Sequence, residues 1–576
     1  MRTETDTFTS FDGKALFYRV WEHDVPSNGK ILLILHRGHE HSERLQNIAD
    51  QKAFEGYKIF SYDNRGHGHT EEPATFEFMN LVRDLDAFVA FVLKKEQKEQ
   101  KDIFIIANSV AGVVASTWVH DYAPDIRGMA LVAPAFRIKL YFPFAKALLK
   151  SVLYFKPNLN VKSYVKSTFL THDLNERKRY DTDTLITPNI PARQLTTLLD
   201  TAQRIVSDAS LITVPTLILS ATHDYVVDSK IEGDFYAELS SKIKKFVQLK
   251  GFYHGILYEV NYQDAINEIA EFINLCFETD IQVSIEEVKK ITQNEYDKIA
   301  FGSLSWFKET AYFLQRTMMK YFGGISKGMS IGMKYGFDSG VTLDHVYKNT
   351  PEGTTWVGEF IDRNYLQSIG WKGIRQRKAH MIAALEEKIA ILHEAGKTVS
   401  ILDIAGGPAR YLIELAAKHP NINIRVRDYQ EQNVNDGRAL AKNLGLQNII
   451  YEQCDAFDRQ NYQHKDLTPN IIVISGVFEL FGDNNLITQA IDGVASIIKD
   501  DGYLIYTGQP WHPQLELIAN VLGNHQNEKW IMRRRSQYEL DRLFALSGFK
   551  KEQMYIDNWG IFTVSVAKMG QKNRET

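Results

Sequence analysis

The sequence predicts an α/β protein with two sheets, one in each half of the chain. Two series of strand-like apolar runs alternate with helical patterns, which is typical of parallel sheets built from βαβ units. The 576 residues exceed the roughly 250 to 300 at which one hydrophobic core stops growing, so at least two domains are expected. Apolar residues make up 44% of the chain, which is enough for a core in each half.

The first series predicts six strands in the N-terminal half. They are "KILLILH" (30–36), "KIFSYD" (58–63), "IFIIA" (103–107), "GMALVAP" (128–134), "PTLILSA" (215–221) and "KKFVQLK" (244–250). About eighty residues separate the fourth run from the fifth, and connections of this length are often lids or caps. We therefore expect a cap over about 135–210, where aromatic and leucine positions interleave with lysines. A helical embellishment without a functional role is the alternative.

The second series predicts the sheet of the C-terminal half. It begins at "VSILDIA" (399–405) and continues through "INIRVRD", "IIYEQCD", "NIIVISG", "GYLIYTG" and "IFTVSVA". Before the last run, "KKEQMYID" indicates a closing hairpin. The stretch of about 260–398 between the two series is mostly helical in pattern. The expected domains are 1–276, a linker over 277–299, a helical segment over 300–398 and a core over 399–570.

Composition excludes several classes of function. The net charge of −4 gives no general attraction to nucleic acid, so no nucleic-acid partner is expected. Cys276 and Cys454 supply neither a disulfide framework nor the spacing of a metal site, and we expect no metal. The polar N-terminus lacks the apolar region of a signal peptide, and no apolar run reaches the ~18 residues that span a bilayer. A cytoplasmic location is expected, with peripheral membrane contact left open.

A serine lies where the third run of the first series turns into a helix, in "IIANSVAGV" (105–113). In a nucleophile elbow a strand turns sharply into a helix so that the serine points out above the sheet, and the turn needs small neighbours. Alanine, the smallest replacement, stands at 107 and 111, where the usual G-x-S-x-G pattern has glycine. We predict that Ser109 is a nucleophile; a serine that only caps the helix is the alternative.

Two further residues follow later strands in the order that a catalytic triad on such a sheet requires. Asp224 follows "PTLILSA" and His254 follows "KKFVQLK". Because the carboxyl ends of parallel strands meet at one edge of a sheet, both should lie beside Ser109. His254 would take the proton of Ser109, and Asp224 would orient the imidazole and stabilise its charged form. Asp228 is the alternative acid.

Two histidine-rich blocks, "LHRGHEHSERL" and "YDNRGHGHTEEP", follow the first two strands of this series. With the elbow and the G-x-x-H-x-x-x-x-E pattern around His254, they make the first 270 residues or so resemble the monoacylglycerol lipase and lysophospholipase branch of the α/β-hydrolases. The resemblance implies oxyanion donors at the backbone N–H groups of Gly38 and Val110, and a cap over an acyl-binding slot. Arg37 stands where that family more often has glycine. It would face solvent, or else crowd the oxyanion loop or reach a phosphate on the substrate.

A second glycine-containing turn lies in "ILDIAGGPARYL" (401–412), between a strand and a helix. Such a turn is a weak signal by itself, because any tight strand-to-helix turn prefers small residues. Asp428 ends the next strand, about the ~20 residues downstream at which nucleotide folds place a ribose-binding acid. Asp455 follows the third strand. A dinucleotide site is disfavoured, because the pyrophosphate-binding motif requires a third glycine and "GGPAR" has proline and alanine in that part of the turn.

Acids at the ends of three successive strands resemble the pattern of class I S-adenosylmethionine-dependent methyltransferases. "LDIAGGPAR" resembles their first motif, with Ala405 and Ala409 in place of the outer glycines. The resemblance implies S-adenosylmethionine as cofactor, with its methionine part at Asp403 and at the backbone of Ala405, Gly406 and Gly407. It also implies ribose hydroxyls at Asp428, and adenine at Asp455 and Ala456. The whole stretch of roughly 300–570 resembles a methyltransferase family found fused to hydrolases of this type.

Candidates near the methyl acceptor are Glu479, Gln509 and His512, judged by their positions at strand ends. Methyl transfer needs an acceptor held in line more than it needs a dedicated base. The run "MRRRSQYEL" (532–540) would bind an anionic headgroup or remain a solvated charge run. The aromatic and basic segment 300–398 would lie on a membrane surface, cap the acceptor pocket, or simply pack against the sheet.

These motifs predict an α/β-hydrolase fold with a helical cap, followed by a Rossmann-like class I methyltransferase with a preceding helical segment. The expected protein is a bifunctional enzyme with small-molecule or lipid substrates: a serine hydrolase of an acyl ester, of the lysophospholipid or monoacylglycerol type, and a methyltransferase. Two alternatives remain open. One is acyl transfer in place of hydrolysis. The other is that one half of the chain is a ligand-binding or scaffold domain without catalytic activity. The second half is the better candidate, because no set of catalytic residues comparable to the triad is found there.

Overall fold

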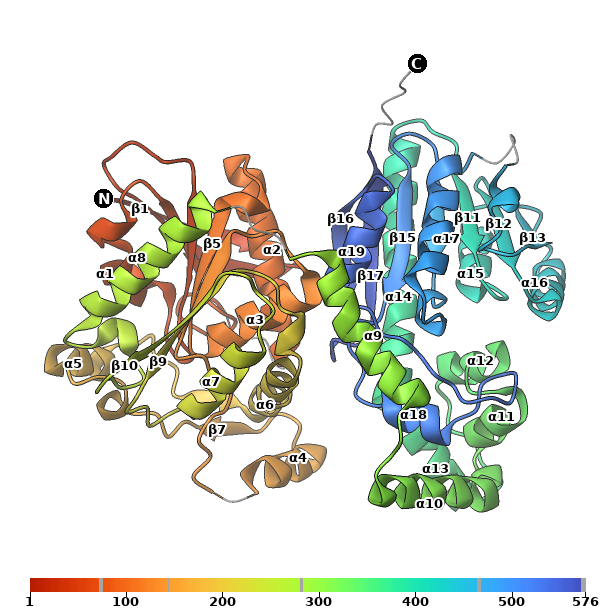
Figure 1. The fold of residues 1–576 in the computed structure, drawn as a ribbon, viewed down its shortest axis with the longest axis horizontal. Helices are drawn as coiled ribbons and strands as arrows, with labels where there is room; N and C mark the ends of the chain where they lie inside the picture. Colours follow the sequence, from red (N-terminus) through yellow and green to blue (C-terminus); the bar gives the residue numbers. More distant parts are fainter. Residues whose placement is uncertain (72–75, 143, 280–282, 464–467, 571–576) are drawn as a thin grey trace. The chain divides into compact units, whose positions relative to one another are not determined.

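The chain divides into two compact units, Met1–Ser284 and Ile285–Thr576 (Figure 1). The computed structural model describes residues 1–71, 76–142, 144–279, 283–463 and 468–570. The stretch expected as a linker, 277–299, is mostly helix: α8 (Tyr262–Glu278) closes the first unit, and α9 (Ile285–Phe301) belongs to the second. Residues 280–282 of that stretch lie outside the described residues.

The first unit is built on an eight-stranded sheet with the order β1-β2-β4-β3-β5-β6-β9-β10. The six predicted strands are confirmed as β3 (Ile31–Leu35), β4 (Lys58–Tyr62), β5 (Ile103–Asn108), β6 (Gly128–Val132), β9 (Thr216–Ala221) and β10 (Lys244–Leu249), all in parallel register. Two more strands, β1 (Arg2–Thr9) and β2 (Ala15–Glu22), extend the sheet antiparallel. β1 escapes prediction because it is almost wholly exposed and buries only Phe8.

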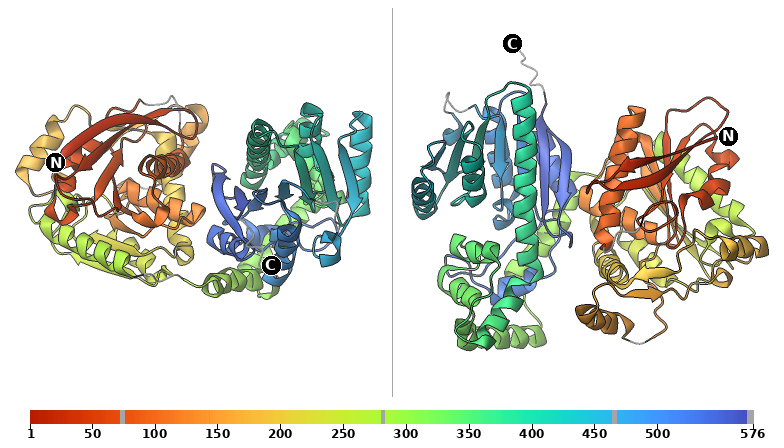
Figure 2. Two further views of the ribbon diagram at one scale, coloured as in Figure 1. Left: turned by 90° about the horizontal axis from the view of Figure 1, so that it is seen from above. Right: turned by 180° about the vertical axis from the view of Figure 1, so that it is seen from behind.

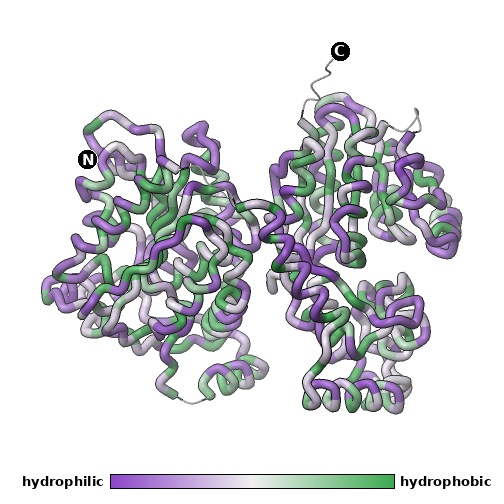
Figure 3. Tube along the Cα trace, in the orientation of Figure 1, coloured by the Kyte–Doolittle hydropathy of each residue, from purple (hydrophilic) through white to green (hydrophobic). Residues whose placement is uncertain are grey.

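Helices cover both faces of this sheet, which is why its central strands are continuously apolar (Figure 2). The covering helices are α2 (Phe78–Glu96), α3 (Val110–Tyr122), α7 (Ser229–Glu238) and α8, with the single turn α1 (Gln46–Ala49). Hydrophobic residues, coloured green along the backbone trace, gather along the central strands in Figure 3. Buried residues of the strands and of α8, among them Leu32, Phe104 and Ile269, form one core cluster.

The connection between β6 and β9 forms the expected cap region. It contains α4 (Ala145–Phe155), β7 (Asn160–Lys162), α5 (Leu174–Thr182), β8 (Asn189–Pro191) and α6 (Ala192–Ser207). β7 and β8 pair antiparallel. The region, which was predicted to be helical, therefore also contains a short two-stranded sheet.

The second unit is built on a seven-stranded sheet with the order β13-β12-β11-β14-β15-β17-β16. Its strands are β11 (Ser400–Ile404), β12 (Asn423–Asp428), β13 (Ile449–Gln453), β14 (Ile471–Ile474), β15 (Tyr503–Gly508), β16 (Phe549–Ile556) and β17 (Thr563–Met569). The first five are parallel, and β17 runs antiparallel to both β15 and β16, which confirms the predicted closing hairpin. The connecting helices are α15 (Arg410–Lys418), α16 (Glu431–Asn443), α17 (Asn484–Ile497), α18 (Leu515–Val521) and α19 (Gln537–Leu546).

A helical segment precedes this sheet, as predicted. It comprises α10 (Trp306–Phe322), α11 (Lys327–Tyr335), α12 (Gly340–Lys348), α13 (Trp356–Leu366) and the 26-residue α14 (Ile369–Glu394). α14 packs against β15, β16 and β17, whereas α10 packs against α18. Among the described residues, no helix is both long and apolar enough to cross a membrane.

Candidate functional sites

Ser109 occupies a strained turn between β5 and α3. Its φ of 53° is positive, which a residue with a side chain rarely adopts, and such strain is found where a fold aims a reactive group. The turn is held by backbone hydrogen bonds from Ser109 N to Val132 O (2.9 Å) and from Ala135 N to Ser109 O (3.0 Å). Ala107 and Ala111, which replace the usual glycines, are both buried against this turn.

The structure brings Ser109, His254 and Asp224 into one chain of hydrogen bonds. The Ser109 hydroxyl lies 2.8 Å from Nε2 of His254, and Nδ1 of His254 lies 2.7 Å from Oδ2 of Asp224. All three side chains are buried. This arrangement allows Nδ1–H to donate to the carboxylate, which leaves Nε2 free to accept the serine proton.

Asp224 is fixed by its other oxygen. Oδ1 accepts the backbone N–H groups of Val226 (2.7 Å) and Val227 (2.8 Å). Burial opposes ionisation of this carboxyl, but the charge and hydrogen bond of His254, together with the two N–H donors, hold its pKa below the usual value. Asp228, the alternative acid, instead caps α7 by accepting Lys230 N.

The loop that carries His254 is anchored by a residue that we did not single out from the sequence. Glu259 accepts hydrogen bonds from the backbone N–H groups of Tyr253 (2.9 Å) and His172 (3.0 Å). It thereby ties the histidine loop to the cap region. The acidic position in the G-x-x-H-x-x-x-x-E pattern was the only signal for it.

The two predicted oxyanion residues lie at the same cavity as the triad serine and histidine. Gly38, Val110, Ser109 and His254 line a cavity of about 150 Å³. A Cβ atom on Gly38 would come within 3.1 Å of Cγ2 of Val110, so the two segments approach closely. The loop after β3 is also tied down, because Asp63 accepts from Ser42 N at 2.6 Å.

Arg37 is buried, so a solvent-facing arginine, one of the three interpretations of the sequence, is wrong. Only 5% of the residue is exposed. Its Nε lies 3.0 Å from Glu40, its guanidinium lies 4.5 Å from the ring centre of Tyr258, and it lines the same cavity as Ser109. The charge is accommodated because Glu40 neutralises it inside the protein.

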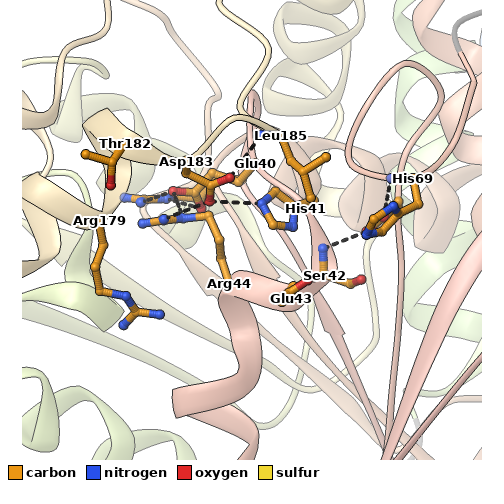
Figure 4. A network of polar contacts seen from close by, with 12 residues as sticks. Glu40, His41, Ser42, Glu43, Arg44, His69, Arg179, Thr182, Asp183 and Leu185 are labelled. Atoms are coloured by element: carbon orange, nitrogen blue, oxygen red, sulfur yellow. Dashed lines mark hydrogen bonds and ion pairs between the residues drawn. The ribbon is translucent and has the colours of Figure 1, made fainter.

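Glu40 is the centre of a buried ionic network that joins the loop after β3 to the cap region (Figure 4). It pairs with Arg37 and Arg44, and Arg44 reaches Asp183 at 3.2 Å, as does His41 at 3.0 Å. Burial would raise the pKa of Glu40, but the two guanidinium groups dominate and lower it to about 2.

Glu40→Gln should destabilise the first unit by about 3 kcal/mol at neutral pH, because Arg37 and Arg44 would be left buried without their carboxylate. The pKa of Glu40 is lowered on folding, from 4.5 to about 2, so its contribution is complete above 4.5 and is lost as the pH falls toward 2. Calorimetric melting as a function of pH measures the effect. Glu43→Gln, at a neighbouring exposed side chain, is the control. Equal melting temperatures for the two variants would contradict the prediction.

The second candidate site is a cavity of about 1010 Å³ at the carboxyl ends of the second sheet. Six of the seven predicted cofactor residues line it: Ala405, Gly406, Gly407, Asp428, Asp455 and Ala456. This is the edge at which parallel α/β sheets bind ligands.

The loop after β11 has the geometry of a tight ligand-binding turn. Ala405 and Ala409 both have positive φ, 55° and 48°, so alanines here adopt the conformation that glycine favours. A Cβ on Gly406 would fall 2.3 Å from Oδ2 of Asp403, so no larger residue fits. Asp428 accepts Gly407 N at 2.8 Å and Gln430 N at 2.9 Å, which connects the loop to the end of β12.

Asp403 does not lie where the sequence prediction places it. It is fully buried beneath the loop and is not among the residues that line the cavity. The Tyr411 hydroxyl donates to its Oδ2 at 2.7 Å, and burial raises its pKa to about 8. In this geometry Asp403 lies against the turn, since a Cβ on Gly406 would fall 2.3 Å from its Oδ2, and Tyr411 of α15 holds it there.

All three predicted acceptor-side candidates, Glu479, Gln509 and His512, line the cavity, as does Arg377, which the sequence did not indicate. Nδ1 of His512 accepts Gln514 N at 3.1 Å, and burial lowers the pKa of His512 to about 4. The neutral ring therefore carries its proton on Nε2. His512 would donate a hydrogen bond to a methyl acceptor bound in the cavity and would not act as a base.

The arginine run is neither a headgroup site nor a solvated run. Arg533, Arg534 and Arg535 are all buried. Arg533 pairs with Glu539 at 2.8 Å, and Arg535 donates to Phe478 O at 2.7 Å. Both interpretations of the run from the sequence are therefore wrong, because the arginines are buried among partners both near in the chain, such as Glu539, and far from it, such as Phe478.

Two family models match the chain, one in each half. A model described as "Serine aminopeptidase, S33" matches residues 26–261, and one described as "Putative methyltransferase" matches residues 269–569. "Uncharacterized protein YnbC" of Escherichia coli (strain K12) is 40% identical over 569 residues, with 97% of each chain covered. The first half alone is similar to "Phospholipase YtpA" of Bacillus subtilis, 23% identical over 44% of this chain and 97% of that one. It is also similar to human "Monoglyceride lipase", 26% identical over 46% of this chain and 87% of that one.

Proposed function

Because this chain belongs to the family described as "Putative methyltransferase" and carries a serine-hydrolase family domain in its first half, we propose that it is an enzyme with two activities. One hydrolyses an acyl ester, and the other transfers a methyl group from S-adenosylmethionine. The observation that carries the proposal is the hydrogen-bonded chain from Ser109 through His254 to Asp224.

In the hydrolase half, His254 accepts the proton of Ser109 while the serine oxygen attacks the ester carbonyl. The carbonyl oxygen becomes negatively charged and is stabilised by the N–H groups of Gly38 and Val110, each worth on the order of 3 kcal/mol. His254 then donates the proton to the departing alcohol, and an acyl ester remains on Ser109. Water, deprotonated by His254, releases the acid and restores the serine.

The proposed substrate is a lysophospholipid or a monoacylglycerol. The cavity beside Ser109 is bordered largely by apolar side chains, among them Leu81, Ile138, Leu140, Leu195 and Leu198. An acyl chain is the natural occupant of such a lining. The relatives named phospholipase and monoglyceride lipase agree with this class. The test is the release of fatty acid from a 1-monoacylglycerol and from a lysophospholipid by the full chain; no release from either would overturn it.

The second cavity suits S-adenosylmethionine by its donors and acceptors. The backbone from Ala405 to Gly407 and the acidic residues Asp428 and Asp455 line it, and Asp428 holds the loop in place by accepting Gly407 N. Asp428 would bind the ribose hydroxyls, because each carboxylate oxygen can accept more than one hydrogen bond. When bound, the cofactor supplies an electrophilic methyl group. The protein's contribution is to hold the acceptor in line and to exclude water.

Asp428→Ala should weaken the binding of S-adenosylhomocysteine by about 10- to 100-fold, because charge-assisted hydrogen bonds to the ribose are lost. Titration calorimetry on the full chain measures the change. The matched control is Asp458→Ala, because Asp458 only caps a short helical turn by accepting Gln460 N at 2.9 Å. A wild type that does not bind, or equal losses in both variants, would overturn the proposal. Binding without methyl transfer to any lipid would favour a ligand-sensing role for this half.

A further inference from the structure

Helix α10 has its polar and apolar sides reversed relative to a surface helix of a water-soluble domain. Seven large apolar residues share about half of its circumference and are all exposed: Trp306, Phe307, Phe313, Leu314, Met318, Tyr321 and Phe322. The exposed fraction is 69% for Trp306 and 73% for Tyr321. A surface helix normally turns such residues toward the core and its charges toward water.

The opposite side of α10, which faces the protein, is mainly polar, although it also carries Met319. Lys308 and Tyr312 both reach Glu516 of α18 at 2.9 Å, and Nη1 of Arg316 donates to Asn520 O at 2.5 Å. Polar contacts therefore fix the orientation of the helix, and they hold its apolar side outward. An exposed apolar patch of this kind marks a surface that binds a membrane, a protein or a ligand.

Charge indicates what that surface binds. Between residues 306 and 335 there is one acidic residue, Glu309, against five basic ones, Lys308, Arg316, Lys320, Lys327 and Lys334, although the chain as a whole carries −4. On α10 itself every charged residue lies outside the apolar arc. An apolar and aromatic face bordered by basic residues is the pattern of a helix that lies in the surface of an anionic membrane.

The same helix forms part of the wall of the large cavity. Met319, on the protein side of α10, lines it together with Met329 of α11 and the loop after β11. α13, which like α10 packs on the turn Gly323–Ile325, lies at the same end of the unit as α10 (Figure 1). Its Trp356 and Phe360 are exposed. An amphiphile that left a membrane at this end would meet the cavity wall directly.

We propose that the exposed face of α10 docks on an anionic lipid membrane. The second part of the proposal is that the methyl acceptor is an amphiphile drawn from that membrane. This part rests on the methyltransferase activity proposed above. The docking itself depends only on the face and its charge.

The test is co-sedimentation of the full chain with vesicles of phosphatidylcholine and phosphatidylglycerol, about three to one, compared with phosphatidylcholine alone. The wild type should bind the anionic vesicles, and less so as NaCl is raised from about 0.1 to 1 M. The double variant Phe313→Ser, Leu314→Ser should bind at least about tenfold more weakly. A matched double variant, Leu444→Ser, Leu546→Ser, also removes two exposed leucines from this unit and should bind as the wild type does.

Three outcomes would overturn the proposal: no binding to anionic vesicles, equal loss in both double variants, or a wild-type dimer that Phe313→Ser, Leu314→Ser converts to a monomer. The last would identify the face as an interface between copies of this chain. Calorimetry with S-adenosylhomocysteine separates the two proposals. Vesicle binding by a chain that does not bind this ligand would leave the membrane face intact and remove only the methyltransferase step.

Discussion

Ser109→Ala should abolish ester hydrolysis, with a fall in kcat on the order of 10⁵- to 10⁶-fold, and should abolish labelling by a fluorophosphonate probe. The reason is that the Ser109 oxygen is the nucleophile of the proposed mechanism, and it lies 2.8 Å from Nε2 of His254, the atom that accepts its proton. Alanine cannot form the acyl intermediate, and binding and the oxyanion donors alone sustain only a small residual rate.

The variant should remain folded, because the substitution removes one hydroxyl and adds no atoms to the turn. Ser116→Ala is the matched control: Ser116 is also buried at α3, but its hydroxyl donates to Gly112 O at 2.8 Å within the helix. Turnover by Ser116→Ala should stay within about twofold of the wild type. Equal probe labelling of the wild type and Ser109→Ala would remove Ser109 from the mechanism.

The fold and the triad could be predicted because they depend on patterns that are local in the sequence. Each buried parallel strand appears as a continuous apolar run, and the carboxyl ends of such strands share one edge of a sheet. Ser109, Asp224 and His254 each follow such a run directly. Their meeting in space therefore follows from topology, although they are up to 145 residues apart.

Buried charges could not be predicted from the sequence in the same way. Arg37 and Arg533 look like solvent-exposed arginines in the sequence, and both are buried because carboxylates meet them inside the protein. The guanidinium of Arg533 also reaches Thr292, 241 residues away in the chain, at 3.1 Å. Asp403 illustrates the same difficulty at the scale of one side chain, since a motif fixes its position on a strand but not the face to which it points.

Asp224→Asn should lower kcat by about 10⁴-fold with little change in KM, and the orientation of the carboxylate explains why. Oδ1 of Asp224 accepts two backbone N–H groups, from Val226 and Val227. An asparagine would keep those bonds with its carbonyl oxygen, so its NH₂ group would face Nδ1 of His254, 2.7 Å from the present Oδ2. Nδ1 would then have to accept, and the ring proton would move to Nε2.

With a proton on Nε2, His254 cannot accept the proton of Ser109, so the nucleophile is not activated although every atom keeps its place. Asp228→Asn is the control, because Asp228 caps α7 and should affect kcat by less than about twofold. Ester turnover and the rate of fluorophosphonate labelling, measured together with the melting temperature, separate loss of activation from loss of folding. If Asp224→Asn turned over substrate as Asp228→Asn does, another group would have to orient His254.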